Sequence, residues 1–481
     1  MAGCTLARGF TVSSDAILIE HRGGSIVADG HHMQPVFFDA PTEQIGELLT
    51  ILRKLGNIDD IVNQKLLPFD LVGQLITAGI LQTSSDRSGL SSPFREKRSI
   101  NDKPEQISLF LILNQYCNLK CVYCLEGQES YEYKARRAMS PHLAKRSIEK
   151  FYDLLNEGGG LGITFFGGEP LLSWPTIREI LTFCEQVQAA DKFGRTINFA
   201  IQTNLSFLPK DFIDLVTRHQ IAIVIDIDGP RDIQNKLRPM KGRISDSFGK
   251  TTNNLKKLAD AEVRFHLRAT LTSENVNYLA EVEALHSALG TKNATELGLL
   301  RPVNSDGFVF PVNLIPSFND IARAIDEGLE RRSELFHQRA AYYAELASEP
   351  LNGEFGCNAS FGLLPTIAYN GAIYPCTWFV GNRNLEIGHI DAAPMISAEA
   401  LKRVEDLMHI NNDPVCSDCN YRHICGGGCA VTRVLTKFGT ISLEGKVALE
   451  SSRSMQCAFT KTLTNYVLRH SIDQIRETPA S

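Results

Sequence analysis

Between residues 107 and about 345, short apolar runs alternate with stretches whose apolar residues repeat at helical spacing. The strand-like runs are 107–113, 163–166, 196–201, 221–227 and 263–271. The helical stretches that follow them are 141–155, 175–186, 211–218, 247–259 and 278–288. Such alternation predicts a parallel sheet covered by helices, since parallel strands need a crossover between them. About six units predict an α/β fold of the partial (β/α)6, TIM-like barrel kind, in which functional residues sit at the carboxyl ends of the strands.

Residues 1–82 have a different pattern and predict a small separate module. Apolar runs at 16–19 and 36–38 come first, and three short helical patterns follow. The first helical pattern spans about 43–55, with Ile45, Leu48, Leu49 and Leu52 on one face. Strands followed by three short helices predict a winged-helix-like module. The alternative is an N-terminal extension that only packs on the main body.

The remaining segments have little apolar periodicity. Residues 83–104 are polar and rich in Ser, Gly and Pro, which predicts a linker before a barrel at 105–345. Residues 346–470 contain many Gly, Asn and Cys, and we expect them to fold around metal rather than around a large apolar core. Residues 471–481 are expected to form a tail.

Composition narrows the functional classes. A length of 481 residues predicts about three domains, and a net charge of −6 without a basic stripe argues against a nucleic-acid partner. No secretory h-region and no run of 18 apolar residues occur, so we expect neither export nor a membrane span. Ten of the 12 cysteines are clustered, and only Cys4 and Cys184 stand alone. Clustered cysteines without an export signal predict metal binding in a reducing, cytoplasmic compartment.

Three cysteines follow the first predicted strand at the spacing C-x3-C-x2-C: Cys117, Cys121 and Cys124. Three thiolates can hold three irons of a four-iron cluster and leave the fourth iron open for chemistry. The alternative is a zinc knuckle. Zinc prefers four protein ligands, and no fourth Cys or His lies near in the sequence.

The stretch 117–124, Cys-Asn-Leu-Lys-Cys-Val-Tyr-Cys, resembles the signature of radical S-adenosylmethionine (radical SAM) enzymes. The resemblance implies that the open iron binds the amino and carboxylate groups of S-adenosylmethionine and that reductive cleavage yields a deoxyadenosyl radical. Gly167, Gly168 and Glu169 end the second strand and match the family motif at the methionine amino group. Glycines let backbone carbonyls approach an ammonium, and Glu169 can add charge. The alternative is an ordinary βα turn.

The resemblance also implies cofactor contacts from Tyr123 in the signature and from four polar residues on later strands: Gln202, Asn204, Asp226 and Arg268. Many relatives have Ser where this chain has Asp226, and an Asp there could accept ribose hydroxyls. Arg268 could pair with the methionine carboxylate. Alternatively, polar residues at these positions finish the strands for packing reasons.

Seven later cysteines resemble the SPASM domain, which carries two auxiliary clusters in peptide- and protein-modifying members of the family. The resemblance assigns an outer set of Cys416, Cys419, Cys425 and Cys457, and an inner set of Cys357, Cys376 and Cys429. The alternative is a zinc-binding treble clef. Fully ligated relatives have one more cysteine shortly before the first, whereas residues 351–356 contain none. Either Glu354 or another side chain completes the inner set, or its open iron binds a substrate thiolate.

These resemblances predict an enzyme that abstracts hydrogen from a peptide residue and installs a cross-link, with a thioether favoured and a carbon–carbon bond as the other outcome. Residues 1–82 loosely resemble a domain that captures the leader of a precursor peptide by adding it as a strand to a sheet edge. A flavodoxin or ferredoxin is the expected electron donor. The alternatives are an anaerobic sulfatase-maturing, formylglycine-forming enzyme and a non-catalytic zinc-binding adaptor. No residue stands out as the general base.

Overall fold

The computed structural model describes residues 10–30, 32–83, 99–124, 137–242, 246–290, 296–301, 312–348, 357–438 and 441–477. Most of the predicted linker, residues 84–98, and Cys4 lie outside the described residues. No helix in the described ranges is long and apolar enough to cross a membrane.

The central element is a nine-stranded sheet with the order β11-β10-β9-β8-β7-β6-β12-β13-β14. Six neighbouring strands pair in parallel and follow the chain in sequence, as a partial barrel requires. They are β6 (Gln106–Asn114), β7 (Gly160–Gly167), β8 (Thr196–Thr203), β9 (Ala222–Asp226), β10 (His266–Leu271) and β11 (Glu296–Leu299). The predicted fold class of an α/β partial barrel is confirmed.

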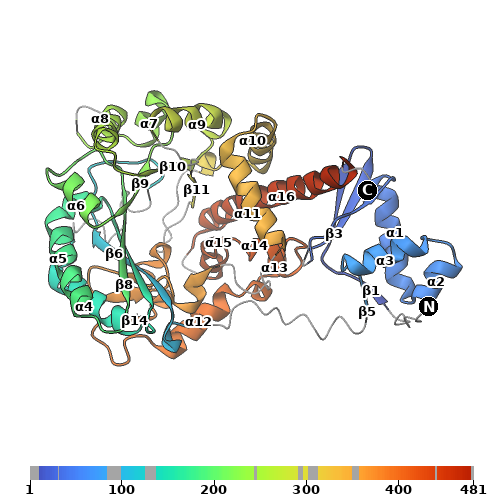
Figure 1. The fold of residues 1–481 in the computed structure, drawn as a ribbon, viewed down its shortest axis with the longest axis horizontal. Coiled ribbons are helices and arrows are strands. Elements are labelled where there is room, and N and C mark those ends of the chain that lie inside the picture. The colour runs from blue at the N-terminus through green and yellow to red at the C-terminus, as the bar shows by residue number, and fades with distance from the viewer. Residues whose placement is uncertain are drawn as a thin grey trace.

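Helices cover the outside of this sheet (Figure 1). They are α4 (Pro141–Asp153), α5 (Trp174–Ala190), α6 (Phe212–Arg218), α7 (Arg231–Leu237), α8 (Ser247–Asp260) and α9 (Leu279–Ala288). Helix α4 begins where sequence chemistry favours it, because Ser140 caps the amide of Leu143 at 3.2 Å and Pro141 occupies the first helical position. Helix α7 is an addition to the predicted pattern.

The barrel core lies between the sheet and these helices. Leu109, Leu111 and Leu113 alternate along β6 and are fully buried, as are Ile148 and Phe151 on α4. Each such side chain contributes about 1.5–3 kcal/mol by leaving water. The isolated thiol of Cys184 is part of the same core.

The N-terminal module has an antiparallel sheet of β2 (Ala16–His21), β3 (Gly24–Asp29) and β4 (Val36–Phe38), in that order. Helices α1 (Thr42–Leu55), α2 (Ile58–Asn63) and α3 (Phe69–Thr77) follow at the predicted places, and β1 (Phe10–Val12) pairs with β5 (Leu81–Thr83). One face of the sheet and the three helices form a core of their own.

The other face of this small sheet packs on the C-terminal part of the chain. Ile17, Ile19 and Ile26 contact Leu468 and Ile472 near the end of the long helix α16 (Leu443–Glu477). Figure 1 shows the module, in blue, at that end of α16, away from the barrel. The helix includes residues 471–477 of the predicted tail.

The cysteine-rich segment begins as an extension of the barrel sheet. Strand β12 (Thr366–Ile367) pairs in parallel with β6, and β13 (Ala372–Tyr374) and β14 (Gly388–His389) continue outward. The segment's helices are α12 (Ala398–Met408), α13 (Pro414–Ser417), α14 (Arg422–Cys425) and α15 (Val431–Val434), and α10 (Phe318–Glu330) and α11 (Glu334–Ser348) precede it. The segment also adds buried side chains to the main core, so it relies on apolar packing more than its composition predicted.

Candidate active site

The first set of predicted residues meets at the carboxyl ends of the parallel strands. The cysteine loop follows β6, which ends at Asn114, and Gly168 follows β7. Asn204 comes directly after β8, and Asp226 is the last residue of β9. Because neighbouring strands are parallel, these ends lie along one edge of the sheet, as the sequence predicted.

Gly167 and Gly168 allow the end of β7 to lie directly against the cysteine loop. A Cβ atom at Gly167 would be 2.5 Å from the carbonyl oxygen of Asn114, and one at Gly168 would be 2.3 Å from that of Tyr116. Backbone hydrogen bonds join the two segments there, from Gly168 N to Asn114 O and from Glu169 N to Tyr116 O, each 3.0 Å long. The glycines therefore position the cysteine loop, a role that sequence reasoning did not assign to them.

Glu169 ties the ends of β7 and β8 together. Its side chain is 1% exposed and accepts hydrogen bonds from the Thr203 hydroxyl at 2.7 Å, the Asn204 amide at 2.9 Å and the Leu171 amide at 3.0 Å. Burial raises the pKa of Glu169 to about 7, although these hydrogen bonds oppose the rise. The carboxylate is thus held rigidly at the sheet edge where the resemblance expects an ammonium group.

The structure brings Cys117, Cys121 and Cys124 together. Burial, together with the charges of Glu169 and Cys124, raises the pKa of the Cys117 thiol to about 12. The Cys117 sulfur accepts from the Leu119 amide at 3.3 Å and from the Asn204 side-chain amide at 3.5 Å. Asn204, predicted as a cofactor contact, therefore lies next to the cysteine loop.

A buried network beside this loop contains two residues to which sequence reasoning assigned no role, Asp228 and Arg238. Asp228 is fully buried and accepts from the Tyr123 hydroxyl, from Arg238 Nε at 2.9 Å and from the Thr270 amide at 2.8 Å. Asp228 lies two residues after Asp226, on the same side of an extended segment, and this spacing could have indicated it. Nothing in the sequence marks Arg238, the residue directly after α7, because its partners lie on other segments of the chain.

Asp226 and Arg268, predicted as separate cofactor contacts, bond to each other at 3.1 Å. Gln202 donates to the same carboxylate at 3.2 Å, and Arg238 lies 3.5 Å from it. Burial alone would raise the pKa of Asp226, but the guanidinium groups of Arg238 and Arg268 hold it below its usual range. Three of the predicted contacts, Gln202, Asp226 and Arg268, thus form one hydrogen-bonded cluster at the sheet edge.

The seven later cysteines gather into the two sets that the sequence resemblance gave. In the inner set, burial, together with the nearby charges of Cys429 and Cys357, raises the pKa of Cys376 to about 12. In the outer set, burial raises the pKa of Cys425 to about 11, with contributions from three neighbouring thiols. These neighbours are Cys457, Cys416 and Cys419. Residues 351–356, and with them Glu354, lie outside the described residues.

Arginines face both sets, although sequence reasoning missed them. Arg301 donates from Nε to the Cys429 sulfur at 3.0 Å, and Arg453 donates from Nη2 to the Cys416 sulfur at 3.1 Å. Arg453 precedes Cys457 by four residues on α16, and this helical spacing was the available signal. Arg301 follows β11, and no local pattern distinguishes it.

Buried hydrogen-bond donors without partners lie near the thiols, and they indicate whether iron–sulfur clusters would fit there. Within the described part of the chain, Arg433 Nη1, Arg453 Nε and Gln456 Nε2 are buried and have no hydrogen-bond partner. A buried donor without a partner costs about 1–3 kcal/mol. Cluster sulfides are acceptors, so the donors fit such a group. Among the described residues, no group of three or more His, Cys, Asp or Glu side chains is arranged to hold a single metal ion.

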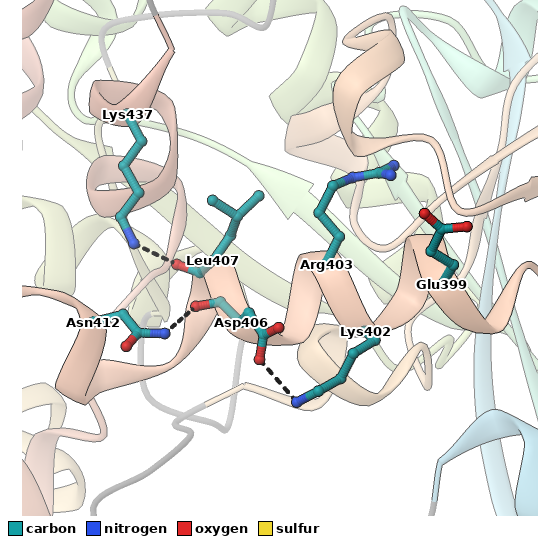
Figure 2. A pocket seen from close by; sticks show the side chains of 7 residues that line it. All are labelled: Glu399, Lys402, Arg403, Asp406, Leu407, Asn412 and Lys437. Carbon is teal, nitrogen blue, oxygen red and sulfur yellow. Dashed lines mark hydrogen bonds and ion pairs between the residues drawn. The ribbon is translucent and has the colours of Figure 1, made fainter.

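A surface cavity of about 540 Å³ lies elsewhere, beside α12 (Figure 2). Its polar side chains are largely engaged: Lys402 pairs with Asp406 at 2.8 Å, and Lys437 donates to the Leu407 carbonyl at 3.0 Å. The cavity is lined by Glu399, Lys402, Arg403, Asp406, Leu407, Asn412 and Lys437. Because it contains no thiol and none of the strand-end residues, we assign it no part in the chemistry.

Comparison with known proteins agrees with this geometry. The family model described as the Radical SAM superfamily matches residues 111–285. The radical SAM cyclopropyl synthase TigE of Paramaledivibacter caminithermalis is 23% identical over 454 residues, covering 90% of this chain and 92% of TigE. A cysteine-type anaerobic sulfatase-maturating enzyme of Clostridium novyi is 22% identical over 326 residues, covering 65% of this chain and 84% of the relative.

Two solved structures have a similar fold. Native anSMEcpe with bound AdoMet and Cp18Cys peptide is 17% identical and has a TM-score of 0.59, covering 78% of this chain and 100% of its own. Streptococcus suis SuiB bound to S-adenosylmethionine is also 17% identical, with a TM-score of 0.51 over 90% of this chain and 98% of SuiB. At this identity the likeness shows the fold.

Proposed function

Residues 111–285 form a radical SAM domain, whose superfamily consists of enzymes, and from this premise we propose that the chain is a peptide maturase. It would bind S-adenosylmethionine and a four-iron cluster, and together they supply a deoxyadenosyl radical that abstracts hydrogen from a peptide residue. The product is a cross-linked peptide. The observation that carries the proposal is that one chain combines three strand-end thiols, two further thiol sets and a docked N-terminal module.

The residues at the sheet edge have distinct proposed roles. Cys117, Cys121 and Cys124 hold the first cluster. The backbone of Gly167 and Gly168 and the carboxylate of Glu169 receive the methionine amino group, because Glu169 is fixed by three hydrogen bonds and keeps a lone pair on Oε2.

Polar residues farther along the edge would bind the rest of S-adenosylmethionine. Arg268 is proposed for the methionine carboxylate and Asp226 for the ribose hydroxyls, with Gln202 and Asn204 beside them. The bond between Arg268 and Asp226 orients both side chains before the cofactor binds, and it helps to keep the Asp226 carboxylate ionised. Tyr123 would be positioned by Asp228 through its hydroxyl.

We propose that the later cysteines form a SPASM-type domain with two auxiliary four-iron clusters. Cys416, Cys419, Cys425 and Cys457 would bind the outer cluster, and Cys357, Cys376 and Cys429 the inner one. The unsatisfied donors of Arg433, Arg453 and Gln456 support clusters over zinc. Iron and sulfide analysis after anaerobic purification tests this assignment, and zinc without iron would leave only the non-catalytic adaptor.

The N-terminal module supports the proposal that the substrate is a precursor peptide with a leader segment. Side chains of the C-terminal part already contact β2, since Asn420 donates to Ala16 O at 2.6 Å and Arg469 donates to Glu20 O at 3.3 Å. Strand β4 (Val36–Phe38) is the opposite edge of the three-stranded sheet. We propose that the leader adds to β4 as a further strand, because β4 is an edge of the sheet and strand addition takes place at a sheet edge.

The breadth of the similarity also favours a peptide maturase over a sulfatase-maturing enzyme. TigE and SuiB each match 90% of this chain, whereas the Clostridium novyi enzyme matches 65% of it. We propose a thioether as the product, since the inner set supplies three thiols and a substrate cysteine could complete it. A carbon–carbon bond is the second candidate, because TigE is named as a cyclopropyl synthase.

The decisive experiment combines the anaerobically loaded enzyme, S-adenosylmethionine, a flavodoxin or ferredoxin as the reductant, and a precursor peptide encoded beside the gene. A cross-link is expected as a mass loss of two hydrogens in the peptide, located by fragmentation. Removal of residues 1–82 is expected to weaken peptide binding while S-adenosylmethionine cleavage and iron content stay unchanged. Unchanged peptide affinity would remove the role of the module, and an unmodified peptide from fully loaded enzyme would count against the maturase.

A further inference from the structure

Arg301 is joined to the inner thiol set by a direct bond. It lies two residues beyond β11, at the carboxyl end of the barrel sheet. Its Nε donates to the Cys429 sulfur at 3.0 Å, while Nη1 donates to the Leu299 carbonyl at 3.0 Å. The guanidinium therefore bridges the last barrel strand and the inner set.

Two neighbours fix the Arg301 side chain in place. The guanidinium carbon lies 4.8 Å from the centre of the Trp378 ring, and Trp378 follows Cys376 by two residues. The Ser452 hydroxyl of α16 donates to the carbonyl of Leu300 at 2.6 Å, which anchors the backbone beside Arg301. Stacking on an aromatic ring and a bound backbone reduce the entropy lost when Arg301 faces the thiols.

The charge of Arg301 is balanced differently from that of Arg453 at the outer set. Arg453 donates from Nη2 to the carboxylate of Asp413 at 2.5 Å as well as to Cys416. Among the described residues, no ion pair joins Arg301 to a carboxylate. Within the described part of the chain, the charge of Arg301 is thus offset by the inner thiols, whereas the charge of Arg453 is shared between Cys416 and Asp413.

We propose that Arg301 is a positioning residue that raises the reduction potential of the inner auxiliary cluster. The inference rests on the proposed function, because it requires a cluster at Cys357, Cys376 and Cys429. A reduced cluster carries one more negative charge, so a fixed cation and a hydrogen bond to its ligand sulfur stabilise the reduced form. Arg453 acts more weakly on the outer cluster, since Asp413 offsets its charge.

The test is an EPR-monitored redox titration of the full chain with Cys117, Cys121 and Cys124 all changed to Ala, so that only the auxiliary clusters give signals. Arg301→Gln, which keeps a planar donor group and loses the charge, is expected to lower one midpoint potential. The expected change is at least tenfold in the ratio of reduced to oxidised cluster, or about 59 mV for one electron. Arg301→Lys is expected to cause a smaller shift, and Arg453→Gln should affect only the other signal.

Equal potentials in Arg301→Gln and the parent would overturn the proposal, and so would equal shifts of both signals. A shift in Arg301→Lys as large as in Arg301→Gln would show a packing role alone. If Arg301→Gln loses iron, Arg301→Lys still tests the proposal. This variant loses the hydrogen bond to Cys429, so an unchanged or raised midpoint potential of the inner cluster would contradict the proposal. Zinc in place of iron would instead refute the proposed function, so the two failures are distinguishable.

Discussion

Gly168→Ala is the substitution that most directly tests how the cysteine loop is positioned. A methyl group at this residue would lie 2.3 Å from the carbonyl oxygen of Tyr116, 2.5 Å from its carbonyl carbon and 2.9 Å from its nitrogen. All three atoms are backbone, so no side-chain rotation can make room. The end of β7 and the loop must move apart instead.

The size of that movement can be taken from the contact distances. The methyl carbon and the Tyr116 oxygen must separate by about 1 Å to reach ordinary van der Waals contact at 3.4 Å. Overpacking of this kind costs about 1–3 kcal/mol. Because metal–ligand distances tolerate only about 0.2 Å, a shift of the backbone next to Cys117 is expected to weaken cluster binding more than it weakens the fold.

The assay compares Gly168→Ala with Gly162→Ala, a control on the same strand. A methyl group at Gly162 would have its nearest contact at 3.8 Å, an ordinary distance. We expect Gly168→Ala to lose about one four-iron cluster per chain and its S-adenosylmethionine cleavage, while Gly162→Ala keeps both. Full iron content and normal cleavage in Gly168→Ala would refute the argument that these glycines position the loop.

Three further predictions concern stability. Asp228→Asn leaves the buried Arg238 guanidinium without its closest carboxylate, so denaturant unfolding should show a loss of about 3–5 kcal/mol; a loss below 1 kcal/mol would contradict this pairing. Asp15→Asn removes the ion pair with Arg422, in which Nη1 lies 2.7 Å from Oδ1, and should speed hydrogen exchange in β2 while exchange in β6 stays unchanged. Unchanged exchange in β2 would argue against this docking contact. Burial lowers the pKa of His286 from 6.5 to about 4, so the unfolded chain binds more protons in this window and stability falls as the pH drops below 6.5. The free energy of unfolding is expected to fall by about 2 kcal/mol between pH 7 and pH 5 because of His286. His286→Gln should remove this pH dependence, as measured by denaturant unfolding at each pH.

The parts of the fold that the sequence predicted are those set by local pattern. Alternating apolar runs and helical stretches specify each strand and helix by themselves, and parallel pairing then fixes which ends meet. Cys117, Gly168 and Asn204 could therefore be placed at one edge of the sheet before any contact was known. The exact partner of Glu169 could not be predicted, because Thr203 and Asn204 reach it only once β7 and β8 are paired.

The residues that the sequence did not indicate have partners far away along the chain. Arg301 meets Cys429 across 128 positions, and Asp15 meets Arg422 across 407. A lone Arg after a short strand reads as a solvated residue until the fold places a thiol 3.0 Å from it. Arg433 is only 2% exposed. Its burial results from tertiary packing and could not be predicted from the spacing of neighbouring residues.

Helix α16 explains why Cys457 stands apart in sequence from the other outer thiols. One stretch of this helix serves both thiol sets: Ser452 bonds Leu300 O at 2.6 Å, Arg453 bonds Cys416 at 3.1 Å, and Gln456 accepts from the Cys429 amide at 3.0 Å. Cys457 adds the fourth outer thiol from the same turn. Farther along, Leu468 and Ile472 pack on the N-terminal module. A thiol on a shorter loop could complete the outer set. Only a long helix, however, can also hold the barrel end, both thiol sets and the N-terminal module at fixed positions relative to one another.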